Sequence, residues 1–117
     1  MPSIESLKKR YSFTQVYNHR RSVANRLLVL YIKESSYNES RFGISISRKV
    51  GGAVVRNRIK RLIREQIRLH IKDIAIGFDM VIVVRTAATL PKDVAFKKIG
   101  QALLDLLDRQ NVLIRHC

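Results

Sequence analysis

Strict alternation of apolar with small or polar residues predicts a β-strand at residues 41–47. The apolar run at residues 27–33, whose side chains would point alternately to two faces, predicts another. One face of each strand is aliphatic or aromatic and should point into a core; it carries Leu28, Leu30, Ile32, Phe42, Ile44 and Ile46. The opposite face of the second strand holds only small residues, which are Gly43, Ser45 and Ser47. A third strand at residues 78–84 is apolar on both faces, so we expect it in the centre of a sheet.

Helical periodicity predicts further elements at both ends of the chain. A short helix over residues 12–19 would place on one apolar face Phe13, Val16 and Tyr17. A last helix would begin near Pro91, which suits the first turn of a helix, and run to about residue 110. Its apolar positions repeat with the helical period.

A long amphipathic helix is predicted between these elements, from about residue 53 to about residue 72. The pair Gly51-Gly52 precedes it, ends the second strand and permits a positive φ. On a wheel of 100° per residue, the aliphatic side chains cluster within about 80° of Ile59; they are Leu62, Ile63, Ile67 and Leu69. The far side gathers polar and basic side chains, which are Asn57, Lys60, Arg61, Arg64, Arg68 and Lys72.

These elements predict an α+β fold, an α/β sandwich with one small mixed sheet of about four strands and three helices. The expected order is α-β-β-β-α-β-α. A chain of 117 residues is long enough for one core and too short for two, so we expect a single domain over residues 1–117. Residues 1–11 and 111–117 are expected to be loosely ordered tails.

The charge distribution gives information on the binding partner, because the net charge of +14 is concentrated in one part of the chain. Residues 1–72 hold 17 Lys and Arg against 4 acidic residues, whereas residues 73–117 hold 6 against 5. A concentrated positive field indicates a polyanionic partner, and nucleic acid is the leading candidate. The alternatives are a merely basic globular domain and an anionic membrane surface.

Location is constrained by what the sequence lacks. No apolar run approaches the ~20 residues of a membrane span, and the N-terminal residues contain no apolar segment typical of a secretory signal. The single cysteine, Cys117, has no partner for a disulfide within the chain. We therefore expect a protein of the reducing cytoplasm.

The basic helix is the strongest candidate for the nucleic-acid contact. Residues 41–72 hold ten Lys and Arg and one acid, Glu65. Lys60 and Arg64 repeat like charge at i, i+4, as Arg64 and Arg68 do, which a helix selected only for stability would avoid. Arginine also predominates, and its planar fork suits phosphate. A solvated basic face is the alternative, and a membrane-surface helix is disfavoured because the predicted helix over residues 53–72 has no aromatic residue.

A second candidate surface combines aromatic and small residues. Phe13 and Tyr17 share a face of the first helix, and Tyr31 lies on the strand face away from the core. Single-stranded bases stack on such rings, so a cleft with these walls and a floor of Gly43, Ser45 and Ser47 could hold a single strand. Lys33 and Arg48 could neutralise its backbone. The alternative is that Phe13 and Tyr17 only pack in the core.

No catalytic constellation is recognisable in the sequence. The three histidines are scattered, and the chain contains no nucleophile, metal-ligand or phosphate-loop motif. No acidic pair suggests a bound Mg²⁺. We therefore expect no catalytic residue and no metal site in this protein, and we expect its partner to supply any chemistry.

The basic segment resembles a known family. The stretches RFGISISRKVG (residues 41–51), AV (53–54), RNRIKR (56–61) and RE (64–65) resemble the bacterial ribonuclease P protein subunit. The resemblance covers roughly residues 6–108. One departure stands at the end of the first helix, where Arg20 replaces the glycine expected in the family and is followed by Arg21.

This resemblance implies the partner, the activity and one feature of the topology. It implies a left-handed βαβ crossover, against the usual rule. It also implies a catalytic RNA that cleaves precursor tRNA with Mg²⁺, so the protein would be a subunit of an endoribonuclease. The protein alone would bind no cofactor, and the holoenzyme would use Mg²⁺. The rivals are a ribosomal protein or RNA chaperone, and a DNA-binding regulator; we expect neither DNA nor membrane as a partner.

The resemblance and the charge pattern together assign residues to two sites. Binding of the catalytic RNA is assigned to Arg48, Lys49, Arg56, Asn57, Arg58, Lys60, Arg61, Arg64 and Arg68. Binding of the 5′ leader of precursor tRNA is assigned to Phe13, Tyr17, Tyr31, Lys33, Ser45 and Ser47.

Overall fold

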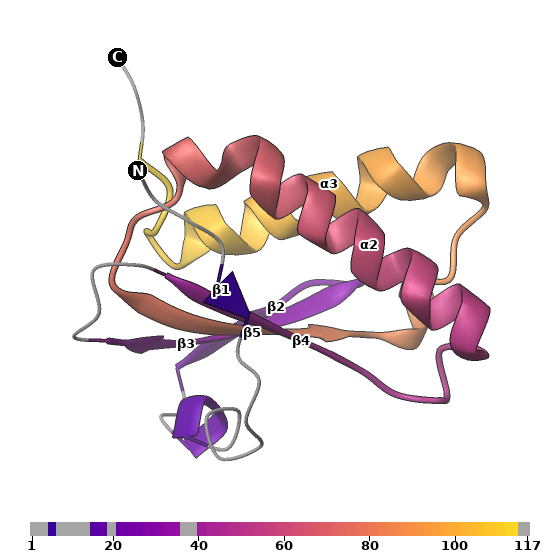
Figure 1. Cartoon of the computed structure of the whole chain (residues 1–117), viewed down its shortest axis with the longest axis horizontal. Helices are drawn as coiled ribbons and strands as arrows, with labels where there is room; N and C mark the ends of the chain where they lie inside the picture. The colour runs from indigo at the N-terminus through magenta and orange to yellow at the C-terminus, as the bar shows by residue number, and fades with distance from the viewer. Residues whose placement is uncertain (1–4, 7–14, 19–20, 36–39, 115–117) are drawn as a thin grey trace.

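The structure of the protein is a computed structural model that describes residues 5–6, 15–18, 21–35 and 40–114. A mixed five-stranded sheet forms its centre, in the order β1-β4-β5-β3-β2 (Figure 1). The strands are β1 (Glu5–Ser6), β2 (Ser22–Ala24), β3 (Leu28–Glu34), β4 (Arg41–Ile46) and β5 (Phe78–Val84). The α+β class and the mixed sheet are thus confirmed.

The apolar strand β5 occupies the centre of the sheet, as its pattern predicts. It pairs antiparallel with β3 and parallel with β4, so seven and six of its residues have a partner on the two sides. The prediction of about four strands missed β1, which pairs parallel with β4 at the sheet edge. A two-residue strand has no readable period, because its pairing comes from the neighbouring strand and not from its own pattern.

Two long helices cover one face of the sheet. They are α2 (Ala53–His70) and α3 (Lys92–Arg109), and Figure 1 shows them side by side above the strands. Two short 3₁₀ turns, η1 (Ile71–Asp73) and η2 (Thr86–Ala88), follow α2 and β5. The segment β4-α2-β5 joins adjacent parallel strands, and the left hand expected for this crossover stays a prediction.

A helical turn at residues 15–18 lies on the other face of the sheet (Figure 1). It is the described part of the predicted first helix; Phe13 lies outside the described residues. Val16 is fully buried there against Val81, and Tyr17, Tyr31 and Val83 pack around them. The small cluster is separate from the main core, so the sheet carries apolar contacts on both faces.

The main core lies between the sheet and the two helices, where the predicted apolar faces meet. Its largest fully buried side chains are Leu28, Leu30, Ile32, Ile59, Ile63, Ile67, Met80, Ile82, Ile99, Leu103, Leu106 and Leu107. Each such side chain contributes roughly 1.5–3 kcal/mol by leaving water. The prediction for Leu69 was wrong, because this side chain is 57% exposed. It stands at the edge of the predicted apolar stripe in the last turn of α2, where the helix has less to pack against.

Gln66 takes a buried place on α2 that a polar residue would not be expected to hold, with 5% of its surface exposed. Its Nε2 donates to the carbonyl of Phe96 on α3 at 3.1 Å. A Cβ on Gly100 would come within 2.5 Å of the Gln66 side chain, so the glycine permits the two helices to approach at this point. The pair therefore sets how closely α2 and α3 pack.

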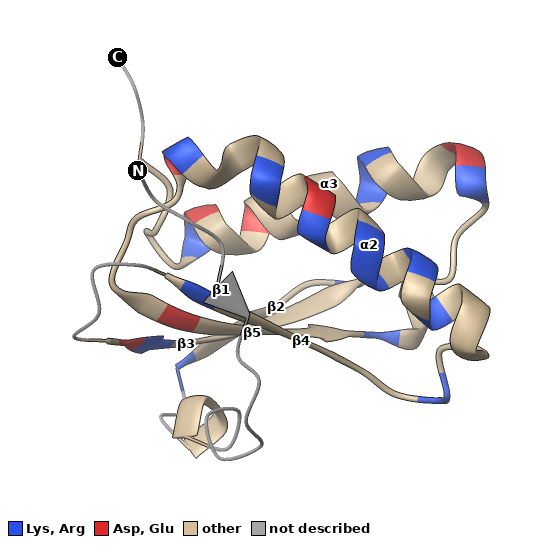
Figure 2. Cartoon of the chain, viewed as in Figure 1, with Lys and Arg blue, Asp and Glu red and all other residues tan. Residues whose placement is uncertain are grey.

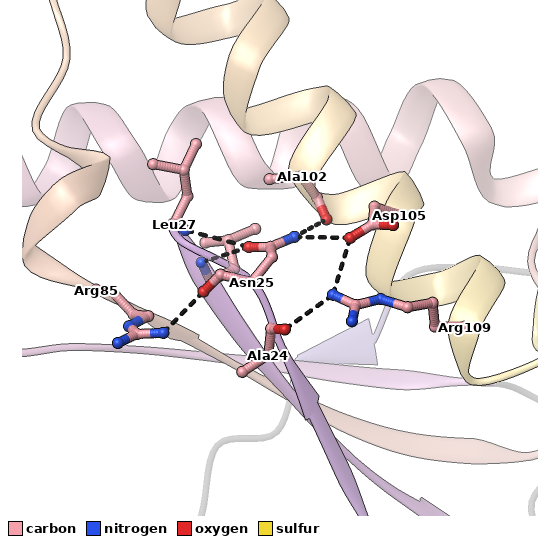
Figure 3. Close-up of polar contacts among 8 residues, drawn as sticks. Ala24, Asn25, Leu27, Arg85, Ala102, Asp105 and Arg109 are labelled. Carbon is pink, nitrogen blue, oxygen red and sulfur yellow. Dashed lines mark hydrogen bonds and ion pairs between the residues drawn. The ribbon is translucent and has the colours of Figure 1, made fainter.

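Asn25 ties the turn between β2 and β3 to α3 (Figure 3). Its Oδ1 accepts from the main-chain N–H groups of Leu27 and Leu28, and its Nδ2 donates to the Ala102 carbonyl at 2.9 Å. Arg109 adds a second link, because its Nη2 donates both to the Ala24 carbonyl and to Asp105. The edge of the sheet at β2 is thus bound to the helical layer by polar contacts.

Residues 111–114 are held to the body of the protein, contrary to the expectation of a loose tail over residues 111–117. Val112 is buried, and Leu113 forms a β-bridge with Ile74. The N–H of Ile114 donates to the carbonyl of Asp73. Asn111 makes the necessary reversal with a φ of 59°, a conformation that asparagine tolerates better than most residues. Residues 111–114 therefore close one end of the core.

Candidate nucleic-acid interface

The turn before α2 presents two basic side chains at the end of the sheet. Arg48 and Lys49 are exposed, while the next residue, Val50, is buried. The Val50 carbonyl accepts from the Thr89 hydroxyl at 2.9 Å, which ties this turn to the loop after β5. The two cations are therefore displayed on an anchored turn.

The glycine pair after this turn, Gly51-Gly52, does not adopt the positive φ that the sequence permits. Gly77 alone among the described glycines has a positive φ, so neither Gly51 nor Gly52 uses the left-handed region. A Cβ on Gly51 would lie 3.0 Å from Val55, so this glycine makes room for the first turn of the helix. Arg56 stabilises the same junction between Gly51 and α2, because its Nε donates to the Gly51 carbonyl at 3.1 Å.

The solvent face of α2 carries a row of cations (Figure 2). The exposed members of the predicted basic face are Asn57, Arg61, Arg64 and Arg68, with Lys72 exposed in η1. Arg68 lies 3.7 Å from Glu65, the only acidic residue of the helix, and both side chains are largely in water. Arg61 and Arg64 join no ion pair within the described part of the chain. These two guanidinium groups are therefore available to an anionic partner.

Three predicted contact residues of α2 lie closer to the protein body. Arg56, Arg58 and Lys60 are half-buried, and Arg56 already binds the Gly51 carbonyl. The Nε of Arg58 is buried without a hydrogen-bond partner, so part of this side chain packs against the protein. The sequence pattern did not separate these residues from Arg61 and Arg64, because the motif counts residue types and not their exposure.

The other predicted site lies on the opposite face of the sheet. We call it the aromatic face, defined by Tyr17, Tyr31, Lys33, Ser45 and their neighbours Val81 and Val83. The rings of Tyr17 and Tyr31 meet edge to face, with centroids 4.8 Å apart and an angle of 84°. Both rings are half-buried, so they pack against the protein and still present surface to solvent.

Strand register shows how the aromatic face is built. Tyr31 stands beside Val81 and Gly43 across three strands, and the next row contains Val29, Val83 and Ser45. The floor is therefore apolar along β5, beside the predicted small residues Gly43 and Ser45 on β4. Ser47 lies beyond the end of β4 and is exposed.

A further row on this face contains an ion pair that the sequence did not indicate. Register places Lys33, Asp79 and Arg41 side by side, and Arg41 binds Asp79 through Nε at 2.8 Å and Nη2 at 2.7 Å. The two side chains keep only 23% and 11% of their surface exposed. Arg41 counts among the ten cations of the basic segment but is committed to the fold. The available signal was Asp79, the one charged residue in an apolar strand.

The two predicted sites thus lie on opposite faces of one sheet, with Arg48 and Lys49 at its end. No group of three or more His, Cys, Asp or Glu side chains that could hold a metal ion occurs among the described residues. Likewise, none of the helices in the described ranges is long and apolar enough to cross a membrane. The arrangement offers two separate binding surfaces, one basic and one aromatic.

Comparison with known proteins finds the same family throughout. The family model described as Ribonuclease P matches residues 1–111. The chain is 40% identical over 113 residues to the ribonuclease P protein component of Alkaliphilus oremlandii, covering 97% of this chain and 96% of that protein. It is 42% identical over 111 residues to that of Clostridioides difficile, covering 94% and 95%.

Solved structures agree with the sequence matches. The RNase P protein of Staphylococcus aureus superposes with a TM-score of 0.82 at 35% identity, covering 92% of this chain and 95% of that one. The RNase P protein of Thermotoga maritima gives a TM-score of 0.76 at 31% identity, covering 90% and 96%. The residues matched by the family model, 1–111, include the basic helix and the aromatic face.

Proposed function

The chain belongs to the family of ribonuclease P protein components, the protein subunits of an endoribonuclease, and on that premise we propose which RNA each surface binds. The solvent face of α2, with Arg48 and Lys49, binds the catalytic RNA subunit. The aromatic face binds the 5′ leader of precursor tRNA. The observation that carries this division is the placement of the two surfaces on opposite faces of the sheet.

The chemistry of each surface supports its proposed partner. Exposed arginines on a rigid helix suit the phosphates of a folded RNA, because each guanidinium can make two parallel hydrogen bonds to one phosphate. A leader is single-stranded, so its bases can stack on Tyr17 and Tyr31 without reading a sequence. Lys33 lies next to these rings and could neutralise a leader phosphate.

The protein itself has no part in bond cleavage under this proposal. The RNA subunit would hold Mg²⁺ and hydrolyse the phosphodiester bond, while the protein increases the affinity for leader-bearing substrate. Its cations would also screen the repulsion between two RNAs, which lowers the amount of Mg²⁺ needed. The Arg56–Arg58 segment would support the interface by shaping the start of α2 as well as by charge.

Reconstitution tests the proposal as a whole. The protein is added to the catalytic RNA at a low Mg²⁺ concentration, and cleavage of precursor tRNA is followed. We expect removal of the 5′ leader to appear only when both components are present. A general RNA chaperone or ribosomal protein would give no such dependence on the substrate, and absence of stimulation at low Mg²⁺ would reject the assignment.

Tyr31→Ala tests the aromatic face. The loss of one stacking ring should weaken binding of leader-bearing precursor about tenfold, because a stacked base contributes roughly 1–3 kcal/mol. Binding of mature tRNA should change little, since mature tRNA has no leader. The affinities of reconstituted enzyme for the two RNAs are measured in parallel.

Tyr31→Phe is the matched control, because it keeps the ring that packs against Tyr17 and removes only the hydroxyl. It should leave the ratio of the two affinities unchanged. An equal loss of both affinities in Tyr31→Ala would remove Tyr31 from the leader site.

A further inference from the structure

We infer that Arg21 and Gln110 are positioning residues for the aromatic face, acting on it from the far side of the sheet; this inference rests on the proposed function. Arg21 forms two hydrogen bonds with Gln110, although 89 positions separate the two residues in the chain. Nε donates to the Gln110 side-chain oxygen at 3.0 Å, and Nη2 donates to the Gln110 carbonyl at 3.0 Å. Nη1 also lies 3.9 Å from Glu34.

Gln110 is itself held in place at the end of α3. It ends α3, where its N–H donates to the Leu106 carbonyl at 3.0 Å, and only 5% of its surface is exposed. The buried residue Val112 follows, and its own N–H returns to the Leu107 carbonyl. Movement of Gln110 would therefore disturb the end of the main core.

The main chain of Arg21 meets the strand that carries Tyr31. Its carbonyl accepts from the Ile32 N–H at 3.0 Å, and the next residue, Ser22, stands opposite Tyr31 in the register of β2 and β3. Tyr17 lies only four positions before Arg21 along the chain. The main chain of Arg21 and Ser22 thus lies directly beside Tyr31 on the neighbouring strand.

This geometry links the helical layer to the proposed leader site. The side chain of Arg21 binds the end of α3, while its main-chain carbonyl binds the amide of Ile32, the residue after Tyr31. The contact between the two tyrosine rings, at 4.8 Å between centroids, depends on where β3 holds Tyr31. Loss of the hydrogen bonds between Arg21 and Gln110 would leave both tyrosine rings present but less well aligned for a stacked base.

Arg21 would otherwise be counted with the cations that attract RNA. Its guanidinium instead makes three contacts within the protein, and its side chain is 38% exposed. A phosphate-binding arginine affects every RNA through charge, whereas a positioning arginine affects only the RNA that uses the aligned surface. The two roles therefore predict different results for precursor and mature tRNA.

Substitutions to methionine in reconstituted enzyme separate the roles. Arg21→Met should lower the ratio of precursor affinity to mature tRNA affinity about fivefold, with affinity for the catalytic RNA changed less than about twofold. Gln110→Met, which keeps the main-chain acceptor, should lower the ratio about threefold. The double variant should lose no more than Arg21→Met alone, because both changes remove the same contact. Arg21→Lys should recover part of the loss through the Gln110 carbonyl.

Arg109→Met is the matched control. Arg109 lies at the same end of α3 as Gln110. It donates to the Ala24 carbonyl of β2, and Ala24 stands opposite Val29, not opposite Tyr31. The Arg109→Met variant should leave the affinity ratio within about twofold of the unsubstituted protein. An equal loss in this control, or an Arg21→Met variant that loses affinity for both tRNAs alike, would overturn the inference.

Failure of the proposed function would look different. If the unsubstituted enzyme does not prefer precursor to mature tRNA, the leader assignment is wrong whatever the variants do. Hydrogen exchange at the Ile32 amide then still tests the structural link in the reconstituted enzyme. We expect faster exchange in Arg21→Met and no change in Arg109→Met; unchanged exchange in both would reject the link itself.

Discussion

Replacing Arg61 and Arg64 together by alanine is expected to lower the affinity for the catalytic RNA about 100-fold. Each arginine is exposed on α2 and joins no ion pair within the described residues, so its charge is free for a phosphate. A hydrogen bond to a charged group contributes roughly 1.5–3 kcal/mol, and two such losses correspond to about two orders of magnitude in affinity. Gel-shift or filter-binding titration measures the change.

The salt dependence of the same variant identifies the contacts as phosphate contacts. Each neutralised phosphate contributes about 0.7–0.9 to the slope of log affinity against log salt concentration. Loss of two contacts should therefore flatten the slope by about 1.5. The helix itself should survive, because alanine has the highest helix propensity and the substitution removes like-charge neighbours from α2.

Lys97→Ala with Lys98→Ala provides the control with equal charge. These lysines are exposed on α3, and their removal lowers the net charge by the same two units. If α2 makes the contact, the lysine variant should bind the RNA within about threefold of the unsubstituted protein. Similar losses in both variants would mean that the protein attracts RNA through its overall field, without a defined contact on α2.

Replacing Asp79 by alanine is expected to lower the free energy of unfolding by about 2–3 kcal/mol. The substitution leaves the Arg41 guanidinium in a place with little water, without the carboxylate that binds it at 2.7 and 2.8 Å. A fully buried pair would cost more to break, but Arg41 keeps 23% of its side chain exposed and can still be partly hydrated. Denaturation by urea measures the change.

Glu65→Ala is the control for this prediction. Glu65 also pairs with an arginine, Arg68, but at 3.7 Å and with 47% and 73% of the two side chains exposed. An exposed pair of this kind contributes under about 0.5 kcal/mol. Replacing both members of the first pair by apolar residues, Arg41→Met with Asp79→Leu, should restore part of the lost stability. A small loss for Asp79→Ala, equal to that of Glu65→Ala, would contradict a structural role for the pair.

Local pattern was sufficient for most of the secondary structure. The strands at β3, β4 and β5 and the helices α2 and α3 lie where the periodicity places them, and β5 is central as its two apolar faces require. Such predictions succeed because side-chain direction within a strand or helix repeats with a fixed geometry, whatever surrounds it. The strand β1 was missed because two residues contain no period to read.

The candidate sites were predicted less completely than the fold. The motif grouped the exposed Arg61 with the half-buried Arg58 and with Arg41, which is held by Asp79. Sequence counts charge, but availability depends on which neighbour the folded chain brings within hydrogen-bond distance. The assignment of individual residues to each RNA stays a prediction.

By itself, the sequence determined that this protein is a basic α+β domain of the ribonuclease P protein family, with its positive charge concentrated in residues 1–72. Periodicity, charge and motif are properties of short segments, so they can be read without the fold. The tertiary structure alone decided which arginines are free and that the two surfaces lie on opposite faces of the sheet. It also decided that Arg21 meets Gln110, because contacts between residues 89 positions apart exist only after the chain packs.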